Sequence, residues 1–245
     1  MEADYIRSVD GRWGKCYFFA HDVFIGPSLL HYGEYNPDET EFLLKLATQA
    51  GKDKIVLDIG ANIGAIAQAL EQSGFTVEAF EPLPEVFALL KKNFKGKAHN
   101  VALGERGGTT TMPKISYDKE NNFGGFSCGT AYKDAGSIDI PIHKLDDYKF
   151  DNIGLMKIDV EGYEERVLRG AMETIKRCKP ILYMEDDRDD KSASLHKTLA
   201  ELGYRCEQHR PYLYREANFF NKKENIWGNN KYWNRNIVCY SDPQP

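Results

Sequence analysis

Residues 54–64 read KIVLDIGANIG, and this stretch decides the fold class of the chain. Its first half is a short apolar run, typical of a strand that is buried on both faces. The run ends near Asp58, and Gly60 then permits a tight turn that a β-carbon would obstruct. Gly64 allows the helix-forming segment that follows, which ends at Gly74, to pack closely on the strand. The stretch therefore predicts a buried strand, a tight turn and a helix.

Segments typical of strands and helices alternate from this turn to the C-terminus. Short apolar runs bounded by turn residues predict strands, and the amphipathic segments between them predict helices. The predicted strands cover residues 76–82, 99–104, 137–145, 154–160, 180–186, 204–210 and 236–241, and the predicted helices cover residues 84–94, 164–178 and 194–203. Residues 137–145 alternate as an exposed edge strand does. This pattern predicts an α/β fold with a doubly wound, mostly parallel sheet.

Residues 1–50 precede this alternation and are rich in aromatic side chains. Short strands are predicted near residues 16–25, followed by a turn at Gly26-Pro27, and a helix is predicted from Asn36 to Gly51. We therefore expect two parts, namely residues 1–50 as an N-terminal extension that caps the site, and residues 51–245 as the α/β domain.

Composition limits the classes of protein to which the chain can belong. Of its 245 residues, 42% are hydrophobic, and 32 basic against 37 acidic residues leave a net charge of −5. This charge argues against a nucleic-acid binder that works through bulk charge. No apolar run reaches about 18 residues, so we expect no membrane span.

The cysteines and the first residues bear on the compartment. Five cysteines are scattered without a CxxC pair, so we expect reduced thiols and no zinc site: Cys16, Cys128, Cys178, Cys206 and Cys239. The first 15 residues, MEADYIRSVDGRWGK, contain no apolar core of the signal-peptide kind. Both observations favour a cytoplasmic protein.

Residues that can bind a cofactor gather where the predicted strands end, because sheets of this kind bind ligands at the carboxyl ends of their strands. Position 62 is asparagine where a dinucleotide-binding turn has glycine, and Asp58 repels phosphate but attracts an ammonium group. Glu81 ends the second strand, about 20 residues after Gly60, and can accept both hydroxyl protons of a ribose. No G-x-x-x-x-G-K-[ST] motif is present, which excludes a P-loop. Together these features indicate S-adenosylmethionine.

A set of motifs, in order along the chain, resembles the FkbM-type methyltransferases, which are class I S-adenosylmethionine-dependent enzymes. The motifs are HYGEYNPDETEFL, VLDIGANIG, AFEPLPEVF, NVALGERGG, NNFGGFS, HKLDDY, MKIDVEGYEERVLRGA and PILYMED. The resemblance covers about residues 31–206. The resemblance implies a Rossmann-like sheet of seven strands, the last antiparallel. It also implies methyl transfer, usually to oxygen, on sugars, polyketides, glycolipids or other small metabolites. Residues 51–245 would then be the methyltransferase domain.

The resemblance further implies that successive parts of the cofactor contact successive strand ends. The methionine portion would lie at the first turn, the ribose at the second strand end, the adenine at the third, and the methyl group at the fourth. The residues carried over, in that order, are Asp58, Gly60, Asn62 and Gly64; Glu81; Val101 and Ala102; and Asp159.

Carboxylates cluster at the ends of the strands predicted at residues 154–160 and 180–186. An aliphatic hydroxyl needs a base to become a nucleophile, and a positioned base contributes about 10²–10⁴-fold. Asp159, Glu161 and Glu185 are the candidates for catalysis. In a second mechanism, Asp159, Glu185 and Asp186 bind Mg²⁺ through hard oxygen ligands, and the metal lowers the pKa of the substrate hydroxyl. The sequence leaves both mechanisms open.

Two further tracts bear on the acceptor. Residues 121–127, NNFGGFS, form either a substrate lid or a plain connector. Residues 211–235 interleave basic and aromatic side chains, which can grip single-stranded nucleic acid or an acidic glycan, or fold over the mouth of the pocket. We expect a small-molecule or glycan acceptor. The alternatives are a nucleic-acid methyltransferase, a non-catalytic S-adenosylmethionine-binding module and a nicotinamide oxidoreductase. The apolar N-terminal segment can also serve a homo-oligomeric interface.

Overall fold

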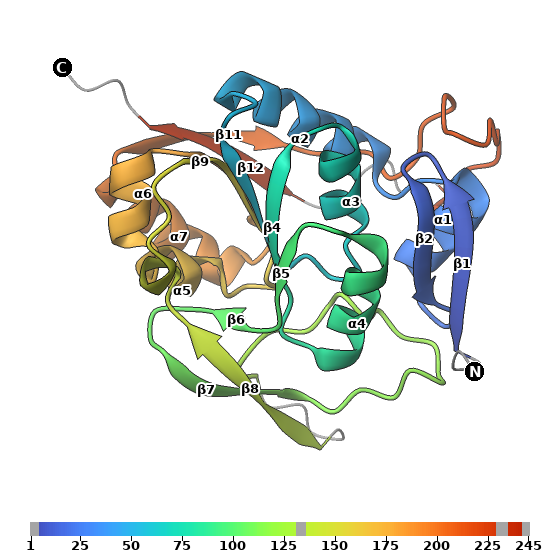
Figure 1. The fold of residues 1–245 in the computed structure, drawn as a ribbon, viewed down its shortest axis with the longest axis horizontal. Coiled ribbons are helices and arrows are strands. Elements are labelled where there is room, and N and C mark those ends of the chain that lie inside the picture. The colour runs from blue at the N-terminus through green and yellow to red at the C-terminus, as the bar shows by residue number, and fades with distance from the viewer. Residues whose placement is uncertain (1–4, 131–135, 229–234, 242–245) are drawn as a thin grey trace.

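A seven-stranded sheet forms the centre of the computed structural model, which describes residues 5–130, 136–228 and 235–241. The strand order is β11-β12-β10-β9-β3-β4-β5 (Figure 1). Neighbouring strands from β10 to β5 are parallel, whereas β12 is antiparallel to both β10 and β11. This confirms the predicted doubly wound class I sheet. The strands are β3 (Ile55–Ile59), β4 (Thr76–Phe80), β5 (Lys97–His99), β9 (Ile153–Ile158), β10 (Ile181–Glu185), β11 (Tyr204–His209) and β12 (Asn236–Ser241).

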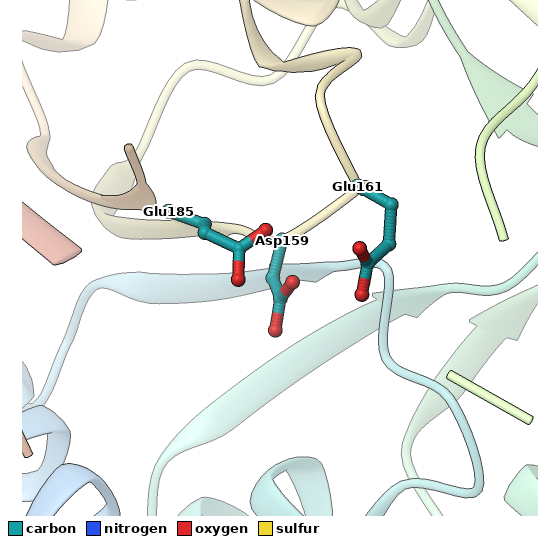
Figure 2. Close-up of side chains that lie close together, drawn as sticks. All are labelled: Asp159, Glu161 and Glu185. Atoms are coloured by element: carbon teal, nitrogen blue, oxygen red, sulfur yellow. The ribbon is translucent and has the colours of Figure 1, made fainter. Parts of the chain in front are cut away.

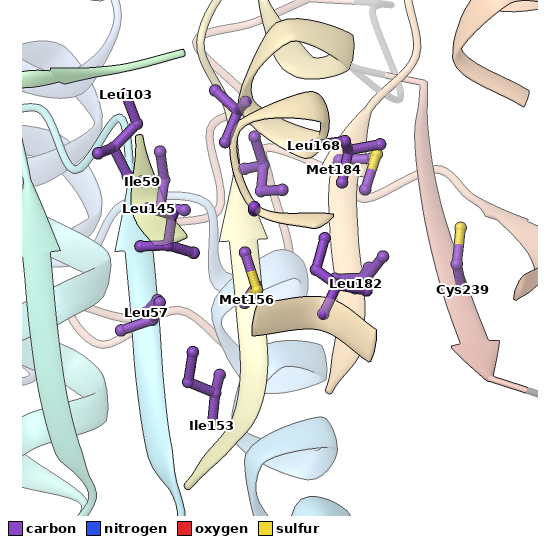
Figure 3. Packing of buried hydrophobic residues seen from close by; sticks show 14 of the residues in the cluster. Leu57, Ile59, Leu103, Leu145, Ile153, Met156, Leu168, Leu182, Met184 and Cys239 are labelled. Carbon is purple, nitrogen blue, oxygen red and sulfur yellow. The ribbon is translucent and has the colours of Figure 1, made fainter. Parts of the chain in front are cut away.

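Helices cover both faces of this sheet, because successive strand residues point to opposite faces. On β3, Leu57 and Ile59 join the core on one face, whereas Val56 joins the core on the other. Figure 3 shows part of the first core, including Leu57, Met156 and Leu182 from three neighbouring strands. Helices α5 (Glu164–Arg169), α6 (Met172–Cys178) and α7 (Asp189–Glu201) pack on the first face, and α2 (Pro37–Ala50), α3 (Ala65–Gln72) and α4 (Pro84–Asn93) lie toward the second.

The N-terminal segment contains a hairpin and two helices. Strands β1 (Ile6–Gly11) and β2 (Gly14–Phe19) pair antiparallel, and α1 (Ile25–Tyr32) follows them at the same side of the molecule (Figure 1). The turn predicted at Gly26-Pro27 is wrong, because both residues lie in the first turn of α1, where proline is tolerated. Helix α2 packs on the central sheet, with Leu43 and Leu46 in the same core as Val56. The predicted boundary at residue 50 therefore lies at the end of α2, a helix that itself packs on the central sheet.

A second, three-stranded sheet is formed by strands that follow β5 along the chain, in the order β6-β8-β7. Its strands are β6 (Ala102–Leu103), β7 (Gly108–Pro113) and β8 (Ser137–His143), followed by the 3-10 helix η1 (Leu145–Tyr148). The strand predicted at residues 99–104 is thus divided between two sheets. Its break coincides with Asn100, whose side-chain amide donates to the carbonyls of Glu81 and Pro82 at 2.9 and 2.8 Å. The strand predicted as an exposed edge, β8, is the middle strand of this sheet.

Two of the five cysteines form a disulfide, which corrects the expectation that all are reduced. Cys206 and Cys239 lie directly opposite each other on the antiparallel strands β11 and β12, and their sulfurs are bonded. Cys16, Cys128 and Cys178 are free thiols. The bonded cysteines are 33 residues apart in sequence, so only strand pairing brings them together. The argument from cysteines for a cytoplasmic location is therefore wrong.

Among the residues that the structure describes, the helices do not meet the requirements for crossing a bilayer. Within the described ranges, which omit residues 1–4, 131–135, 229–234 and 242–245, none has both the length and the apolar character of a membrane span.

Candidate active site

The turn after β3 has the backbone conformation that its glycines predict. Gly60 has a φ of +78°, and a β-carbon there would lie 1.8 Å from the carbonyl oxygen of Asp159. Gly64 has a φ of +84°, and a β-carbon there would lie 2.5 Å from Cδ1 of Leu90 in α4. Glycine at these positions therefore lets β3 approach the end of β9, and lets α3 begin against α4.

Asn62 connects this turn to the end of β4. Its φ of +51° lies in the left-handed region, which asparagine tolerates better than most residues. Its backbone N–H donates to Oε2 of Glu81 at 3.0 Å, and the N–H of Leu83 donates to Oε1 at 2.9 Å. Burial raises the pKa of Glu81 to about 7, although both hydrogen bonds lower it. Each carboxylate oxygen has further lone pairs, so Glu81 can still accept hydroxyl groups.

A cleft runs along the carboxyl ends of β3, β4 and β9. Six of the predicted cofactor-binding residues line it: Gly60, Asn62, Glu81, Val101, Ala102 and Asp159. Among the described residues, Gly64 and Asp58 are not part of this lining, and Asp58 has no exposed surface. Asp58 therefore lies behind the lining of the cleft, and its contact with an ammonium group stays a prediction.

Lys157 lines the cleft, although sequence reasoning does not select it. Its Nζ lies 3.2 Å from Oδ1 of Asp58 and 3.4 Å from Oδ2 of Asp159. Burial alone lowers the pKa of this lysine, but the charges of Asp58 and Asp159 raise the pKa on balance. Lys157 therefore carries a positive charge that holds both carboxylates. The sequence does contain one indication of this role, since the lysine stands within the apolar strand sequence GLMKI. A lysine that is buried in a strand needs an acidic partner.

Asp159, Glu161 and Glu185 form a carboxylate cluster (Figure 2), and the first two of them line the cleft. One oxygen from each lies within 4.8 Å of the other two. Asp159 follows β9 directly, Glu185 is the last residue of β10, and the two strands are parallel neighbours. Glu161 has a φ of +56°, so the chain turns after β9 instead of continuing as a strand. The structure thus brings together all three residues that the sequence selects for catalysis.

The cluster concentrates negative charge in a partly buried place. Burial, followed by the charge of Asp159, raises the pKa of Glu185 to about 10, and burial raises the pKa of Glu161 to about 7. Glu161 has a partner, since Nη2 of Arg188 lies 2.7 Å from its Oε2. Glu185 is 5% exposed, and its Oε2 has no hydrogen-bond partner in the part of the chain that the structure describes. This oxygen therefore requires a proton, a cation or a donor from a ligand.

Asp186 lies outside this cluster, although the sequence suggested it as a metal ligand. Its Oδ2 accepts a hydrogen bond from Oγ of Ser192 at 3.0 Å, and lies 3.0 Å from Nε2 of His196, both in α7. Neighbouring residues at the end of a strand point in opposite directions, so Glu185 and Asp186 cannot both face Asp159. Glu161 supplies the third carboxylate instead.

The N-terminal extension contributes to the cleft, and the C-terminal loop packs beside it. Phe24 and Tyr35, from the N-terminal extension, line the cleft, as does part of the tract at residues 121–127. The indole ring of Trp227 stacks on Phe24 with 5.9 Å between ring centroids. The backbone N–H of Ile226 donates to the hydroxyl of Tyr32 at 2.9 Å. The C-terminal loop therefore packs against α1 and supports the wall that α1 forms.

Two basic side chains of this loop form ion pairs within the protein. Lys223 lies 3.8 Å from Glu216, and Arg235 lies 2.7 Å from Asp189. Lys231 and Trp233, which completed the predicted basic-aromatic pattern, lie outside the described residues.

Comparisons with known proteins find similarity to methyltransferases. The family model described as "Methyltransferase FkbM domain" matches residues 58–206. The 31-O-demethyl-FK506 methyltransferase FkbM of Streptomyces tacrolimicus is 28% identical over 195 residues, which cover 64% of this chain and 69% of that protein.

Two solved structures share the fold at low identity. Methyltransferase FkbM from Methylobacillus flagellatus KT is 18% identical with a TM-score of 0.50, and the match covers 76% of this chain and 43% of that one. The chain thus spans less than half of that protein's length. A SAM-dependent O-methyltransferase from Thermotoga maritima is 13% identical with a TM-score of 0.50, and the match covers 98% and 78% of the two chains. Because the family model matches more than half of its residues, the chain belongs to the FkbM family of methyltransferases.

Proposed function

We propose that the protein transfers a methyl group from S-adenosylmethionine to a hydroxyl group of a sugar, a glycan or another small metabolite. The observation that carries the proposal is the convergence of the carboxylates of Asp159, Glu161 and Glu185, two of which line the cleft. The Streptomyces relative is named for methylation at an oxygen, and the Thermotoga protein is named an O-methyltransferase. These names support oxygen as the acceptor atom.

The residues of the cleft fit S-adenosylmethionine. Glu81 can accept the ribose hydroxyls, the apolar Val101 and Ala102 can border the adenine, and the carboxylate cluster favours cationic groups. A dinucleotide fits less well, because its pyrophosphate would meet the side chain of Asn62 where the nucleotide-binding turn has glycine. When bound, S-adenosylmethionine supplies an electrophilic methyl group on a positively charged sulfur.

Asp159 and Glu185 would then act on the acceptor. A hydroxyl of the acceptor can donate a hydrogen bond to Asp159, whose carboxylate lines the cleft and is partly exposed, and this bond would fix the position of the acceptor. Asp159 or Glu185 would take the hydroxyl proton of the acceptor as its oxygen receives the methyl group that S-adenosylmethionine supplies. Lys157 holds the carboxylate of Asp159 in place for this step.

The cluster also fits Mg²⁺, because it offers three hard oxygen donors, one of them without a partner. Asp159, Glu161 and Glu185 would hold the ion, which when bound would lower the pKa of a substrate hydroxyl. Arg188 would remain beside Glu161 and limit the net negative charge of the site.

Calorimetry and a transfer assay test the proposal. We expect S-adenosylhomocysteine to bind to the purified protein and NADH not to bind; the reverse would indicate a nicotinamide oxidoreductase. With methyl-tritiated S-adenosylmethionine, we expect label in neutral glycosides and polyols, and none in transfer RNA or single-stranded DNA. Label in nucleic acid alone would replace the proposal. Cofactor binding without transfer to any of these acceptors would favour a non-catalytic module.

A further inference from the structure

The strands of the central sheet hold two of the three carboxylates in the cluster. Glu185 is the last residue of β10, and the backbone N–H of Asp159 donates to the carbonyl of Ile59 at 3.0 Å, which continues the pairing of β9 with β3. Glu161 lies two residues further along and belongs to no strand or helix. Its place in the cluster therefore depends on what fixes the turn after β9.

This turn has a backbone conformation that a residue with a β-carbon adopts only at a cost. The φ angles of Glu161 and Gly162 are +56° and +84°, so two successive residues are left-handed. Glycine accepts such angles freely, whereas a glutamate is strained there. Contacts must therefore hold Glu161 in place, and without them its backbone would relax and redirect its carboxylate away from Asp159.

Glu164, the first residue of α5, supplies such contacts. Its Oε1 accepts the backbone N–H of Val160 at 3.1 Å and the backbone N–H of Gly162 at 3.0 Å. These two residues stand directly before and after Glu161, so a single carboxylate oxygen bridges the turn. Glu164 is 6% exposed, and hydrogen bonds are stronger in such surroundings than in water.

The other polar contacts of the turn come from long side chains at the surface. Nη2 of Arg188 lies 2.7 Å from Oε2 of Glu161, and Nζ of Lys191 donates to the carbonyl of Gly162 at 2.7 Å. The side chain of Arg188 is 46% exposed, and exposed ion pairs contribute little to stability. Glu164 is therefore the buried anchor of the turn.

We infer that Glu164 is a positioning residue, which holds Glu161 in the carboxylate cluster without itself contacting substrate or cofactor. Glu164 lies outside the lining of the cofactor cleft at the ends of β3, β4 and β9. Its effect on methyl transfer rests on the proposed function, whereas its effect on the position of Glu161 does not.

Crystal structures of the wild-type protein, Glu164→Leu and Glu164→Gln, each grown with S-adenosylhomocysteine, test the position of Glu161. Leucine accepts neither N–H group, so we expect the turn to change and the carboxylate of Glu161 to leave the cluster. Glutamine keeps a carbonyl oxygen that accepts both, so Glu161 should stay within 4.8 Å of Asp159 and Glu185. An unchanged turn in Glu164→Leu overturns the inference. Absence of S-adenosylhomocysteine from the wild-type cleft overturns the proposed function instead.

Amide hydrogen exchange, followed by NMR, tests the same contacts without disrupting them. Val160 and Gly162 lie outside the helices and strands, so their amides exchange fast unless a side chain accepts them. We expect both amides to be protected in the wild-type protein and in Glu164→Gln. Fast exchange of both amides in the wild-type protein overturns the inference.

A double-mutant cycle tests whether Glu164 acts through Glu161. In single-turnover transfer, we expect Glu164→Leu to lower the rate constant as much as Glu161→Gln does, by up to about 100-fold, and the double variant to be no slower than either. Glu164→Gln should keep the wild-type rate. Effects that multiply in the double variant would mean that Glu164 acts independently of Glu161, and would contradict the inference.

Asp146→Leu is the matched control for loss of stability. Asp146 also accepts two backbone N–H groups, those of Glu173 and Thr174, but it does not line the cofactor cleft. Asp146→Leu should lower the free energy of unfolding in urea as Glu164→Leu does, and leave the rate of methyl transfer unchanged. An equal loss of transfer in both variants would assign the effect of Glu164→Leu to destabilisation alone, against the inference.

Discussion

The ammonium nitrogen of Lys157 lies 3.2 Å from a carboxylate oxygen of Asp58, and the two residues face each other in register on β9 and β3. Asp58 has no exposed surface, and Lys157 is 3% exposed. The pair explains how a charged residue is accommodated in each of two central strands. It also connects the first turn of the cofactor cleft to Asp159, which the same ammonium group contacts.

Removing this lysine should destabilise the fold. Lys157→Met leaves Asp58 buried beside no cation, and breaking a buried pair in this way costs about 3–5 kcal/mol. Unfolding in urea, followed by circular dichroism, measures the loss. Lys45→Met is the control, because the Lys45–Glu41 pair is exposed and contributes about 1 kcal/mol or less. Similar losses of unfolding free energy in both variants would mean that the buried Lys157–Asp58 pair stabilises the fold no more than an exposed pair does.

Removing the carboxylate of Glu81 should weaken cofactor binding by about 10- to 100-fold, because hydrogen bonds from the ribose to a charged group are lost. Glu81→Ala can also disturb the turn, since Glu81 accepts the backbone N–H groups of Asn62 and Leu83. Calorimetry should therefore compare S-adenosylhomocysteine with its 2′,3′-dideoxy analogue. The wild-type protein should prefer the hydroxylated form, and the variant should not. Glu85→Gln, an exposed change in the next helix, should leave both affinities unchanged.

Neutralising Glu185 should affect chemistry more than cofactor binding. Glu185→Gln removes a carboxylate that can take the proton, so we expect kcat to fall about 10²–10⁴-fold. The affinity for S-adenosylhomocysteine should stay within about twofold, because Glu185 does not line the cofactor cleft. Single-turnover transfer of a tritiated methyl group measures the first quantity, and calorimetry the second. Glu207→Gln, on the exposed face of β11, is the control. Full activity in Glu185→Gln would remove Glu185 from the mechanism.

Chelation distinguishes the two mechanisms that the carboxylate cluster allows. If a divalent metal binds there, EDTA should lower the rate of methyl transfer by at least about tenfold and Mg²⁺ should restore it. A readout independent of activity is the binding of Mn²⁺, followed by electron paramagnetic resonance in wild-type protein and in Glu161→Gln. An unchanged rate after chelation, together with no Mn²⁺ binding, would leave the carboxylates to act as bases without a metal.

Stability should depend on pH through Glu39, which is 4% exposed on α2. Burial raises its pKa from 4.5 to about 8, although Lys157 lowers it. The folded state therefore holds a proton that the unfolded state releases, so this contribution is complete below about pH 4.5 and is lost as the pH rises through 8. Glu39→Gln should become progressively more stable than wild type between pH 5 and 8, by at most about 1.4 kcal/mol per pH unit.

The control for this prediction lies on the same helix. The pKa of Glu41 is lowered, chiefly by its hydrogen bond to Arg215, so its contribution is present above its unfolded pKa and is lost only as the pH falls through the lower folded value. Glu41→Gln should therefore show a constant difference from wild type between pH 5 and 8. Urea unfolding at several pH values gives the free energy of unfolding of both variants. If this free energy changed with pH in the same way in Glu39→Gln and in wild type, the raised pKa of Glu39 would be contradicted.

The sequence by itself determined the sheet, its first turn and six of the residues that line the cleft. Apolar runs with a strand period, glycines at positions 60 and 64, and an acid after the second strand are local features. Their consequences follow from backbone sterics and from burial, which act within a few residues. The convergence of Asp159 with Glu185 was also accessible, because adjacent parallel strands end at the same edge of the sheet.

The tertiary structure alone decided which side chains meet beyond the strand ends. Glu161 joins the carboxylate cluster because the chain turns after β9, whereas Asp186 points toward Ser192 and His196 of α7. The partner of Lys157 depends on the register of two strands, and the disulfide of Cys206 depends on the pairing of two others. These relationships join residues that are distant in sequence, so they follow from the packing of the whole chain and not from any local pattern.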